Sequence, residues 1–240
     1  MPNLSERVMM PELMDSEETD PDTFRACLID LARVNQLTLA YRPTLNFLDR
    51  LFNSGRLPKD RALVIVDVGS GYGDMLRKVD RWAARRGTKV KLIGLDLNPW
   101  SARSATEATP KNRPIRWVTA NVFDFRPDER IDVIMSSLFT HHLDNASLVR
   151  FVAWMEANAG TAWFVNDLHR HPLPYHVFGF LARALRFHYF VQHDGPISIA
   201  RAFSAADWQL VLARAGVPTS AANVNWYFPF RICVERVRSA

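Results

Sequence analysis

The stretch Val64-Ile65-Val66-Asp67-Val68-Gly69-Ser70-Gly71-Tyr72-Gly73-Asp74 decides the fold of this chain. A short, continuous run of β-branched apolar residues is typical of a buried parallel strand. The glycines that follow let the backbone turn tightly and approach a ligand more closely than a Cβ atom would allow. The helix-like segment after them points its free N–H groups at the loop. The stretch therefore predicts a strand, a ligand-binding loop and a helix.

The spacing of the glycines distinguishes between two kinds of nucleotide site. A dinucleotide-binding fingerprint is G-x-G-x-x-G, whereas the order here is G-S-G-Y-G, with an acid two residues before the first glycine. This pattern resembles motif I of the class I S-adenosylmethionine (SAM)-dependent methyltransferases. The resemblance implies cofactor contacts from Asp67, Gly69, Ser70, Gly71 and Gly73. A glycine loop alone is weak evidence, so further elements must follow at suitable distances.

A second strand-like run, residues 89–95, ends in Asp96 and is followed by Leu97 and Asn98. In a βαβ unit, an acid at the end of the second strand can accept hydrogen bonds from both ribose hydroxyls of a bound nucleoside. Asp96 could instead form a turn or an N-cap ahead of Asn98-Pro99. After the glycine loop, ribose binding is the favoured interpretation, and the resemblance implies that Asp96, Leu97 and Asn98 all contact the cofactor.

A third strand-like run, residues 116–118, leads into a loop with Asn121, Val122 and Phe123. In the resembled family this loop closes over the adenine ring, and an acid there binds the exocyclic amine. The resemblance places Asn121 at that acid's position, and an Asn carbonyl can still accept the hydrogen bond. Asp124 is the alternative if the register slips.

A fourth element, Ile131 to Asp144, is a strand-like run and its exit, and it contains Ser136-Ser137 and Thr140-His141-His142-Leu143. The segment resembles the strand-four exit of small-molecule methyltransferases of the ubiquinone and menaquinone biosynthesis type, which often carry His-His-Leu there. The resemblance implies that Ser137 lies near the cofactor's sulfonium and that the histidines lie where an acceptor binds. Four such elements in order, from residue 64 to residue 144, match the superfamily and say little about the substrate.

The rest of the chain fits a single α/β domain. At 240 residues and 48% hydrophobic, it can bury one sizeable core. The resemblance implies a Rossmann-like three-layer sandwich with a mostly parallel seven-stranded sheet and a last antiparallel strand. Residues 1–23 are expected to be an acidic segment that need not be ordered. Residues 24–240 form the domain, with a helical cap at 24–60 and a substrate-lid insert at 168–203.

The lid insert is rich in histidine and aromatic residues, and its prolines are predicted to bracket one helix-like stretch, Val177 to Phe190. In related enzymes such an insert and the N-terminal helices roof the acceptor pocket. An aromatic roof fits a flat or hydrophobic acceptor. Most of these aromatic side chains can equally be ordinary core packing.

Composition excludes some classes of protein. No apolar run reaches the length of a membrane span, and the acidic N-terminus lacks the features of a signal peptide. Cys27 and Cys233 lie on apolar segments and are predicted to be buried thiols. The chain is therefore expected to be cytoplasmic.

The net charge of +5 raises the question of nucleic-acid binding. The basic residues on the helix after the glycine loop are interpreted as a solvated face. The strand-four exit Ser136-Ser137-Leu138-Phe139 also lacks the Asn/Asp-Pro-Pro-Tyr of methyltransferases that act on base amino groups. No nucleic-acid partner is expected, and the sequence does not reveal the oligomeric state.

A metal site is not expected either. The histidines lack ligand spacing, and no His-Glu-x-x-His or cysteine pair is present. Asn166-Asp167 superficially resembles part of the magnesium set of catechol-type methyltransferases, but a third acid at the strand-four exit is missing.

The predicted function is a SAM-dependent methyltransferase that moves a methyl group to a small aromatic or hydrophobic acceptor, such as a phenolic hydroxyl in secondary metabolism. The protein would align the reacting atoms and exclude water. A histidine can take the phenol's proton near neutral pH, and the candidates are His142 and His193, the latter beside Asp194. C-methylation uses the same kind of site. The alternatives are an RNA or protein methyltransferase and a non-catalytic SAM-binding protein.

Overall fold

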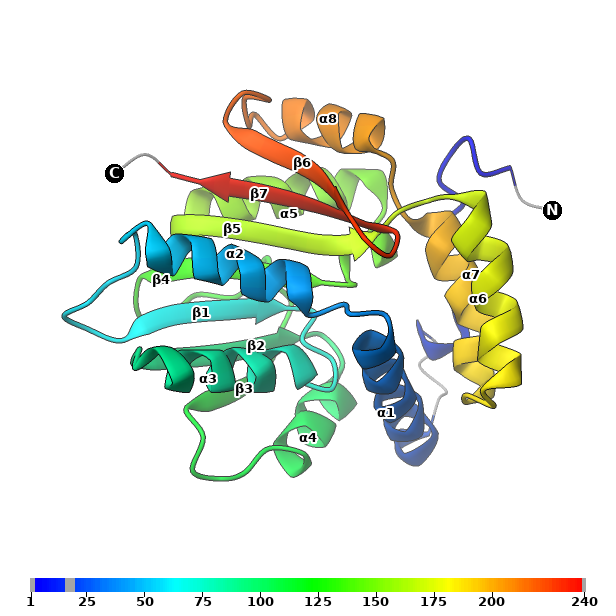
Figure 1. The fold of residues 1–240 in the computed structure, drawn as a ribbon, viewed down its shortest axis with the longest axis horizontal. Helices are drawn as coiled ribbons and strands as arrows, with labels where there is room; N and C mark the ends of the chain where they lie inside the picture. The colour runs from blue at the N-terminus through cyan, green and yellow to red at the C-terminus, as the bar shows by residue number, and fades with distance from the viewer. Residues whose placement is uncertain (1–2, 16–19, 239–240) are drawn as a thin grey trace.

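The structure is a computed structural model that describes residues 3–15 and 20–238. Seven strands form one twisted sheet in the order β3-β2-β1-β4-β5-β7-β6 (Figure 1). The first five strands are parallel to one another, and β7 runs antiparallel to both β5 and β6. The predicted sheet is therefore confirmed. The strands are β1 Leu63–Val68, β2 Val90–Asp96, β3 Ile115–Thr119, β4 Ile131–Ser137, β5 Ala159–Leu168, β6 Ala222–Tyr227 and β7 Arg231–Val237.

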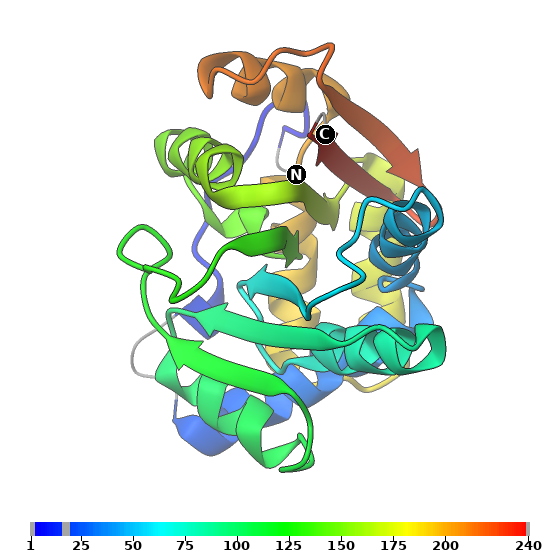
Figure 2. The same ribbon diagram turned by 90° about the vertical axis from the view of Figure 1, so that its left-hand side faces the viewer.

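Helices cover both faces of the sheet, which makes three layers (Figure 2). Helices α2 (Arg42–Asn53) and α3 (Asp74–Arg86) pack on one face, where Leu63 and Ile65 point. Helices α5 (Asn145–Asn158) and α8 (Ala205–Arg214) pack on the other face, with Val64 and Val66. All six residues of β1 are buried, as a parallel strand covered on both faces requires.

Three more helices lie beyond the carboxyl ends of the parallel strands (Figure 1). They are α1 (Pro21–Leu37), α6 (Pro172–Ala184) and α7 (Tyr189–Arg201), while α4 (Pro99–Glu107) packs against β2 and β3. The 3₁₀ turns η1 (Leu13–Asp15) and η2 (Thr140–His142) lie beside α7. Helices far apart in sequence thus face the same edge of the sheet, where ligands of open α/β sheets bind.

The lid insert differs from the prediction in one respect. The single helix-like stretch from Val177 to Phe190 is wrong, because the chain forms two helices that are separated by residues 185–188. Arg186 there has a φ of 55°, which a continuous helix does not allow. Pro172 and Pro174 lie in the first turn of α6, where a missing N–H costs nothing. Pro196 lies inside α7 rather than at its boundary.

Residues 3–15, here called the N-terminal strap, run over α7 and η2. The strap hydrogen-bonds to α7 through the backbone of Val8, which donates to Ala200 O at 3.2 Å. Glu12, expected in an acidic segment that need not be ordered, is 4% exposed. Glu17 and Glu18, which the same prediction included, lie outside the described residues. Part of the predicted acidic segment is therefore packed against the fold.

Both cysteines are buried free thiols, as predicted. Across residues 3–15 and 20–238, no helix combines the length and the apolar character needed to cross a lipid bilayer.

Candidate active site

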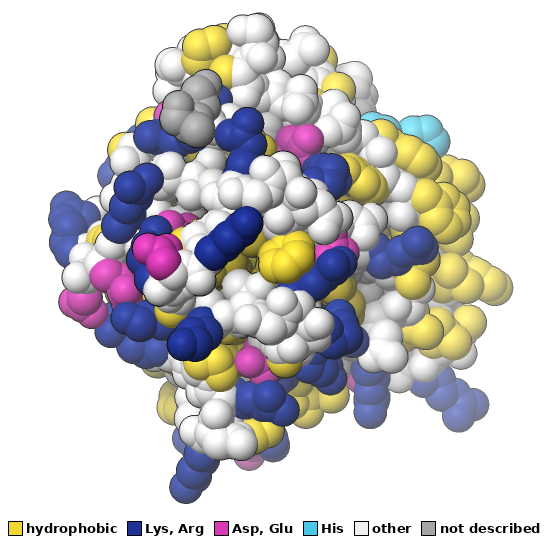
Figure 3. All heavy atoms as spheres, turned by 60° about the vertical axis from the view of Figure 1, so that its left-hand side comes forward, with side chains coloured by type: hydrophobic (Ala, Val, Ile, Leu, Met, Phe, Trp, Pro, Cys, Tyr) yellow, Lys and Arg dark blue, Asp and Glu magenta, His cyan; other side chains and the backbone are white. Residues whose placement is uncertain are grey.

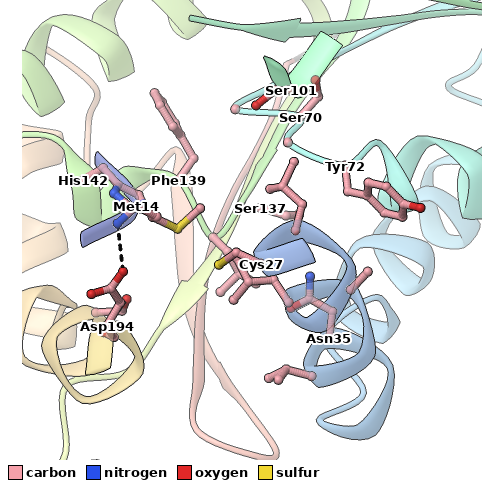
Figure 4. Close-up of a pocket in the computed structure, with 18 of the residues that line it drawn as sticks. Met14, Cys27, Asn35, Ser70, Tyr72, Ser101, Ser137, Phe139, His142 and Asp194 are labelled. Atoms are coloured by element: carbon pink, nitrogen blue, oxygen red, sulfur yellow. Dashed lines mark hydrogen bonds between the residues drawn. The ribbon is translucent and has the colours of Figure 1, made fainter. Parts of the chain in front are cut away.

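A cavity of about 820 Å³ lies at the carboxyl edge of the parallel strands. Its walls come from the glycine loop after β1, the turn after β2, the exit of β4, helices α1 and α7, and the N-terminal strap. A cavity of this size fits a nucleoside cofactor together with a small second ligand. Figure 4 shows Ser70, Ser137 and Tyr72 toward one end, and Met14, His142 and Asp194 toward the other.

The glycine loop adopts a conformation that only glycine takes without strain. Gly69, Gly71 and Gly73 have φ values of 72°, 48° and 73°, in the left-handed region. A Cβ atom at Gly69 would lie 2.5 Å from the Phe139 ring, and one at Gly73 would lie 2.2 Å from the Trp117 ring. At Gly71 only a Leu28 methyl lies within 4 Å, at 3.8 Å. Two glycines therefore serve close packing, while Gly71 keeps the cavity floor open.

Asp96 holds the loop in place. Its Oδ2 accepts the backbone N–H of Gly71 at 2.8 Å, and its Oδ1 accepts that of Asn98 at 2.9 Å. Burial raises the pKa of Asp96, although these N–H groups oppose the rise. The carboxylate thus lines the cavity at the end of β2, where the prediction placed a ribose acceptor.

At the ends of β1 and β4, two buried polar atoms of the cavity wall lack partners among the described residues. They are Oδ1 of Asp67 and Oγ of Ser137. Burial, together with the nearby Asp74 and Asp96, raises the pKa of Asp67 well above its usual value of 3.8. Buried polar atoms are normally hydrogen-bonded, so these atoms fit a ligand with a cationic or hydrogen-bonding group. The amino group and positive sulfur of SAM meet that description.

The predicted cofactor residues divide into two groups. Eight of them line the cavity: Asp67, Gly69, Ser70, Gly71, Asp96, Leu97, Asn98 and Ser137. The other four lie outside its wall. Gly73 faces Trp117, Val122 is buried in the core, Phe123 lies beneath Arg150, and the Asn121 side chain accepts the N–H of Phe123 at 3.0 Å.

The two predicted catalytic histidines occupy different environments. His142 lies in η2 and lines the cavity, with its Nδ1 3.9 Å from Oε2 of Glu12. His193 is outside the cavity wall, and its side chain is 51% exposed. Its Nδ1 lies 2.8 Å from Oδ1 of Asp194, so the adjacent residues do pair. Asp194 also accepts the backbone N–H groups of Leu13 and Met14 and thereby anchors the strap.

The prediction did not include His141 as a candidate base, although its geometry suits that role better than the geometry of His142 or His193. His141 is 3% exposed and lines the cavity, and its Nδ1 lies 2.7 Å from Oδ1 of the fully buried Asp167. Burial alone would raise the pKa of Asp167, but His141 and the hydroxyl of Thr140 hold it well below its usual value. The sequence offered a partial signal for this pair, because His141-His142 follows the fourth strand-like run and Asn166-Asp167 ends the next apolar run along the chain. Which strands are neighbours, and so whether these ends meet, depends on the sheet order. Parallel strands that are neighbours bring such ends together.

The comparisons with known proteins find a methyltransferase domain within the chain. Residues 65–159 match a family model described as a methyltransferase domain. The matched segment runs from β1 to the start of β5 and includes the glycine loop, Asp96 and the β4 exit. The match is in keeping with the predicted S-adenosylmethionine cofactor. A search of curated proteins finds no match to the chain.

Solved structures of methyltransferases share the fold. A SAM-dependent methyltransferase from Aquifex aeolicus is 17% identical with a TM-score of 0.60, over 91% of this chain and 98% of that one. The magnesium protoporphyrin IX methyltransferase from Synechocystis, with bound S-adenosylhomocysteine (SAH), is 15% identical with a TM-score of 0.55, over 84% of each chain. A structure described as an O-methyltransferase from Nostoc punctiforme is 12% identical with a TM-score of 0.57, over 88% and 60%.

One group of described residues in the methyltransferase has the composition of a metal site. Ligand atoms of Glu12, His141 and His142 lie within 4.8 Å of one another. The Glu12 carboxylate, however, already accepts the hydroxyl of Ser198 at 3.0 Å and lies 3.6 Å from the Arg201 guanidinium. A cation of the protein therefore compensates this carboxylate.

Proposed function

We propose that the methyltransferase moves the methyl group of SAM to a phenolic hydroxyl of a small aromatic or hydrophobic acceptor. The observation that carries this proposal is the composition of the cavity beyond the glycine loop. Helices α1, α6 and α7 supply apolar walls there, and the walls meet two histidines at the β4 exit. The apolar residues are Phe24, Cys27, Leu28, Leu31, Phe178, Phe190 and Val191.

We assign to the cofactor the half of the cavity that eight of the predicted residues line. Asp96 is placed to accept the ribose hydroxyls, and Asp67 and Ser137 offer unpartnered oxygens to polar groups of the amino-acid part. Trp100, at the start of α4, adds an aromatic side chain to this wall. When bound, SAM supplies a methyl group already activated by its positive sulfur. The protein's part is alignment of the acceptor and exclusion of water.

The proton of the acceptor hydroxyl goes to the histidine pair. Because the Asp167 carboxylate accepts from Nδ1 of His141, that nitrogen carries the hydrogen and Nε2 remains an acceptor. A base held by a third group is the usual arrangement for activating a hydroxyl. His141 is thus the first candidate, and His142, whose ring centroid lies 4.3 Å from that of His141, is the second. The O–H bond breaks and the proton stays on the imidazole, while the O–CH₃ bond replaces the S–CH₃ bond.

The first test is calorimetric binding of SAH, with Asp96→Ala as the variant and Asp124→Ala as the control. Asp124 is exposed and lies outside the cavity wall. Micromolar binding corresponds to about 8 kcal/mol, and loss of the ribose acceptor should weaken it tenfold or more. Asp124→Ala should leave it unchanged. Equal affinities for wild type and Asp96→Ala would contradict the cofactor site.

Acceptor screening then separates the competing functions. Methylation of phenols, quinols or polyketide aromatics supports the proposal, and the position of the methyl group distinguishes O- from C-methylation. Steep salt dependence of RNA binding would favour an RNA methyltransferase. SAH binding without turnover on any acceptor class would favour a non-catalytic binding protein.

On the face shown in Figure 3, Lys and Arg side chains are scattered among acidic, apolar and other atoms, which suits a solvated surface.

A further inference from the structure

Arg231 is a buried cation in the wall of the cavity. It is the first residue of β7 and pairs with Leu168 at the carboxyl end of β5, so it lies at the ligand edge of the sheet. The residue is 3% exposed. Among the described residues that line the cavity, it is the one lysine or arginine.

The guanidinium group of Arg231 makes only part of the hydrogen bonds that it can donate. Its Nη2 donates to Oγ1 of Thr38 at 3.0 Å, whereas Nε and Nη1 are buried and have no hydrogen-bond partner among the described residues. Burial lowers the pKa of Arg231, and the more distant Asp167 partly opposes this. Buried charges in proteins are normally paired, because an unpaired one costs several kcal/mol.

Four carboxylates around the cavity are engaged elsewhere, and Asp67 forms no ion pair with Arg231 in the described part of the chain. Oδ1 and Oδ2 of Asp167 accept from His141, Thr140 and Leu168. Asp74 accepts the Tyr41 hydroxyl at 2.6 Å, and Asp96 and Asp194 accept backbone N–H groups. Within the described part of the chain, the structure gives Arg231 no ion pair. An anion that completes its hydrogen bonds must therefore come from a ligand.

We infer that Arg231 forms a carboxylate-binding subsite of the cavity. A carboxylate is planar and only accepts hydrogen bonds, which suits a guanidinium with N–H groups to donate. Two ligands could supply it, namely the methionine part of the cofactor and the acceptor.

The position of Arg231 favours the acceptor. β7 lies three strands from β1 in the sheet order, which is roughly 14 Å at the usual spacing of neighbouring strands. The glycine loop follows β1 and Asp96 ends β2, while the His141–Asp167 pair lies on the β4 and β5 side, between them and Arg231. This placement deepens the proposed function, on which the acceptor assignment rests: the acceptor would carry a carboxylate as well as the hydroxyl.

The test compares ligands that differ by the carboxylate, in wild type and in Arg231→Met. Calorimetry with SAH and with decarboxylated SAH measures the cofactor's carboxylate. Calorimetry with 4-hydroxybenzoate and 4-hydroxybenzamide, at saturating SAH, measures an acceptor carboxylate. Arg236→Met is the matched control, because Arg236 lies on the same strand and pairs with Glu156 outside the cavity wall.

We expect wild type to bind 4-hydroxybenzoate at least tenfold more tightly than the amide, and Arg231→Met to abolish that preference while SAH affinity changes less than twofold. A tenfold preference for SAH over decarboxylated SAH that Arg231→Met removes would keep the subsite and assign it to the cofactor. If Arg231→Met alters neither preference, the subsite is overturned.

Folding of the variant is a separate readout. Because Arg231→Met removes an unpaired buried charge, the ligand-free variant should melt at or above the wild-type temperature. Arg231→Lys, which keeps the charge, should retain part of the carboxylate preference, and it replaces the methionine variant if that one fails to fold. SAH binding requires no acceptor. The comparison of SAH with decarboxylated SAH therefore still tests the subsite if the proposed phenolic acceptors do not bind.

Discussion

At the scale of single residues, the candidate site concentrates groups that are unfavourable in the ligand-free fold. Asp67 is 2% exposed with an unpartnered oxygen, and Arg231 is 3% exposed with two unpartnered nitrogens. Such groups reduce stability, and they persist in proteins mainly where function uses them. The residues that destabilise this fold are thus the ones expected to bind ligands.

Asp67→Asn tests whether the buried carboxyl group ahead of the glycine loop reduces stability and contributes to ligand binding. In the unfolded chain Asp67 ionises near pH 3.8, whereas its folded pKa is well above that value. Stability is therefore lost as pH rises above 3.8 toward the folded pKa, because the unfolded state releases the proton first. The ligand-free variant should melt higher than wild type at neutral pH and match it below pH 3.8.

On the proposed cofactor site, the same variant should bind SAH less tightly, because it removes the carboxyl group that we propose to ionise opposite the cofactor's amino group. Differential scanning fluorimetry with and without SAH measures both effects, and Asp124→Asn serves as the exposed control. A lower neutral-pH melting temperature for ligand-free Asp67→Asn would contradict the argument.

The histidine pair gives a second residue-scale prediction. His141→Gln removes the imidazole that Asp167 orients, so turnover of an identified acceptor should fall by roughly 10²–10⁴, the usual contribution of a general base. SAH affinity should stay the same, as calorimetry can check. His193→Gln is the control, since its side chain is exposed outside the cavity wall. Unchanged turnover in both His141→Gln and His142→Gln would rule out a histidine base.

At the scale of elements, three arginines join the N-terminal strap to the lid insert. Arg7 donates to the backbone oxygens of Arg201, His141 and Leu143 and to the Asn145 side chain. Arg170 donates to Leu4 O and Ser5 O, and Arg201 donates to Met10 O and His142 O. Part of the positive charge that raised the nucleic-acid hypothesis therefore holds the strap, α7 and η2 together.

Arg7→Ala should loosen this junction. Burial lowers the pKa of Arg7 to about 10, and the guanidinium also lies 4.2 Å above the Phe203 ring. Losing hydrogen bonds from a charged group costs about 1.5–3 kcal/mol, so the melting temperature should drop by several degrees. Amide exchange of residues 141–143 should accelerate. Arg33→Ala, which removes an exposed i,i+3 pair with Asp30, should change stability by less than about 0.5 kcal/mol. Equal effects of the two variants would contradict the role of the strap.

At the scale of the whole molecule, the sheet order explains how distant segments form one site. Residues from β1, β2, β4, β5 and β7 line the cavity at the carboxyl edge of the parallel strands, and the N-terminal strap and α1 cover it. Helices on both faces bury the sheet, which leaves this edge as the place where polar groups can converge on a ligand. Glu12 and Arg231, which are far apart in the sequence, therefore line the same cavity.

The sequence by itself determined the parts of this protein that depend on local patterns. Apolar runs of strand length and glycines with positive φ are patterns of neighbouring residues. The strand β1, the glycine loop and the acid at the end of β2 could therefore be predicted directly from the sequence. The matching order of the later strands gave the superfamily. Even local patterns failed where two signals competed, as in the lid, where the apolar stretch concealed the turn at residues 185–188.

Only the tertiary structure decided which polar groups meet. His141 and Asp167 are 26 residues apart, Arg7 reaches residues 134 to 194 positions away, and Arg231 turns inward at the start of a closing strand. Neither periodicity nor propensity encodes such encounters, because they arise from strand order and from the packing of helices over the edge. The fold and most of the residues in the proposed cofactor half of the cavity could thus be predicted from the sequence, while the candidate base and the candidate carboxylate anchor required the assembled sheet.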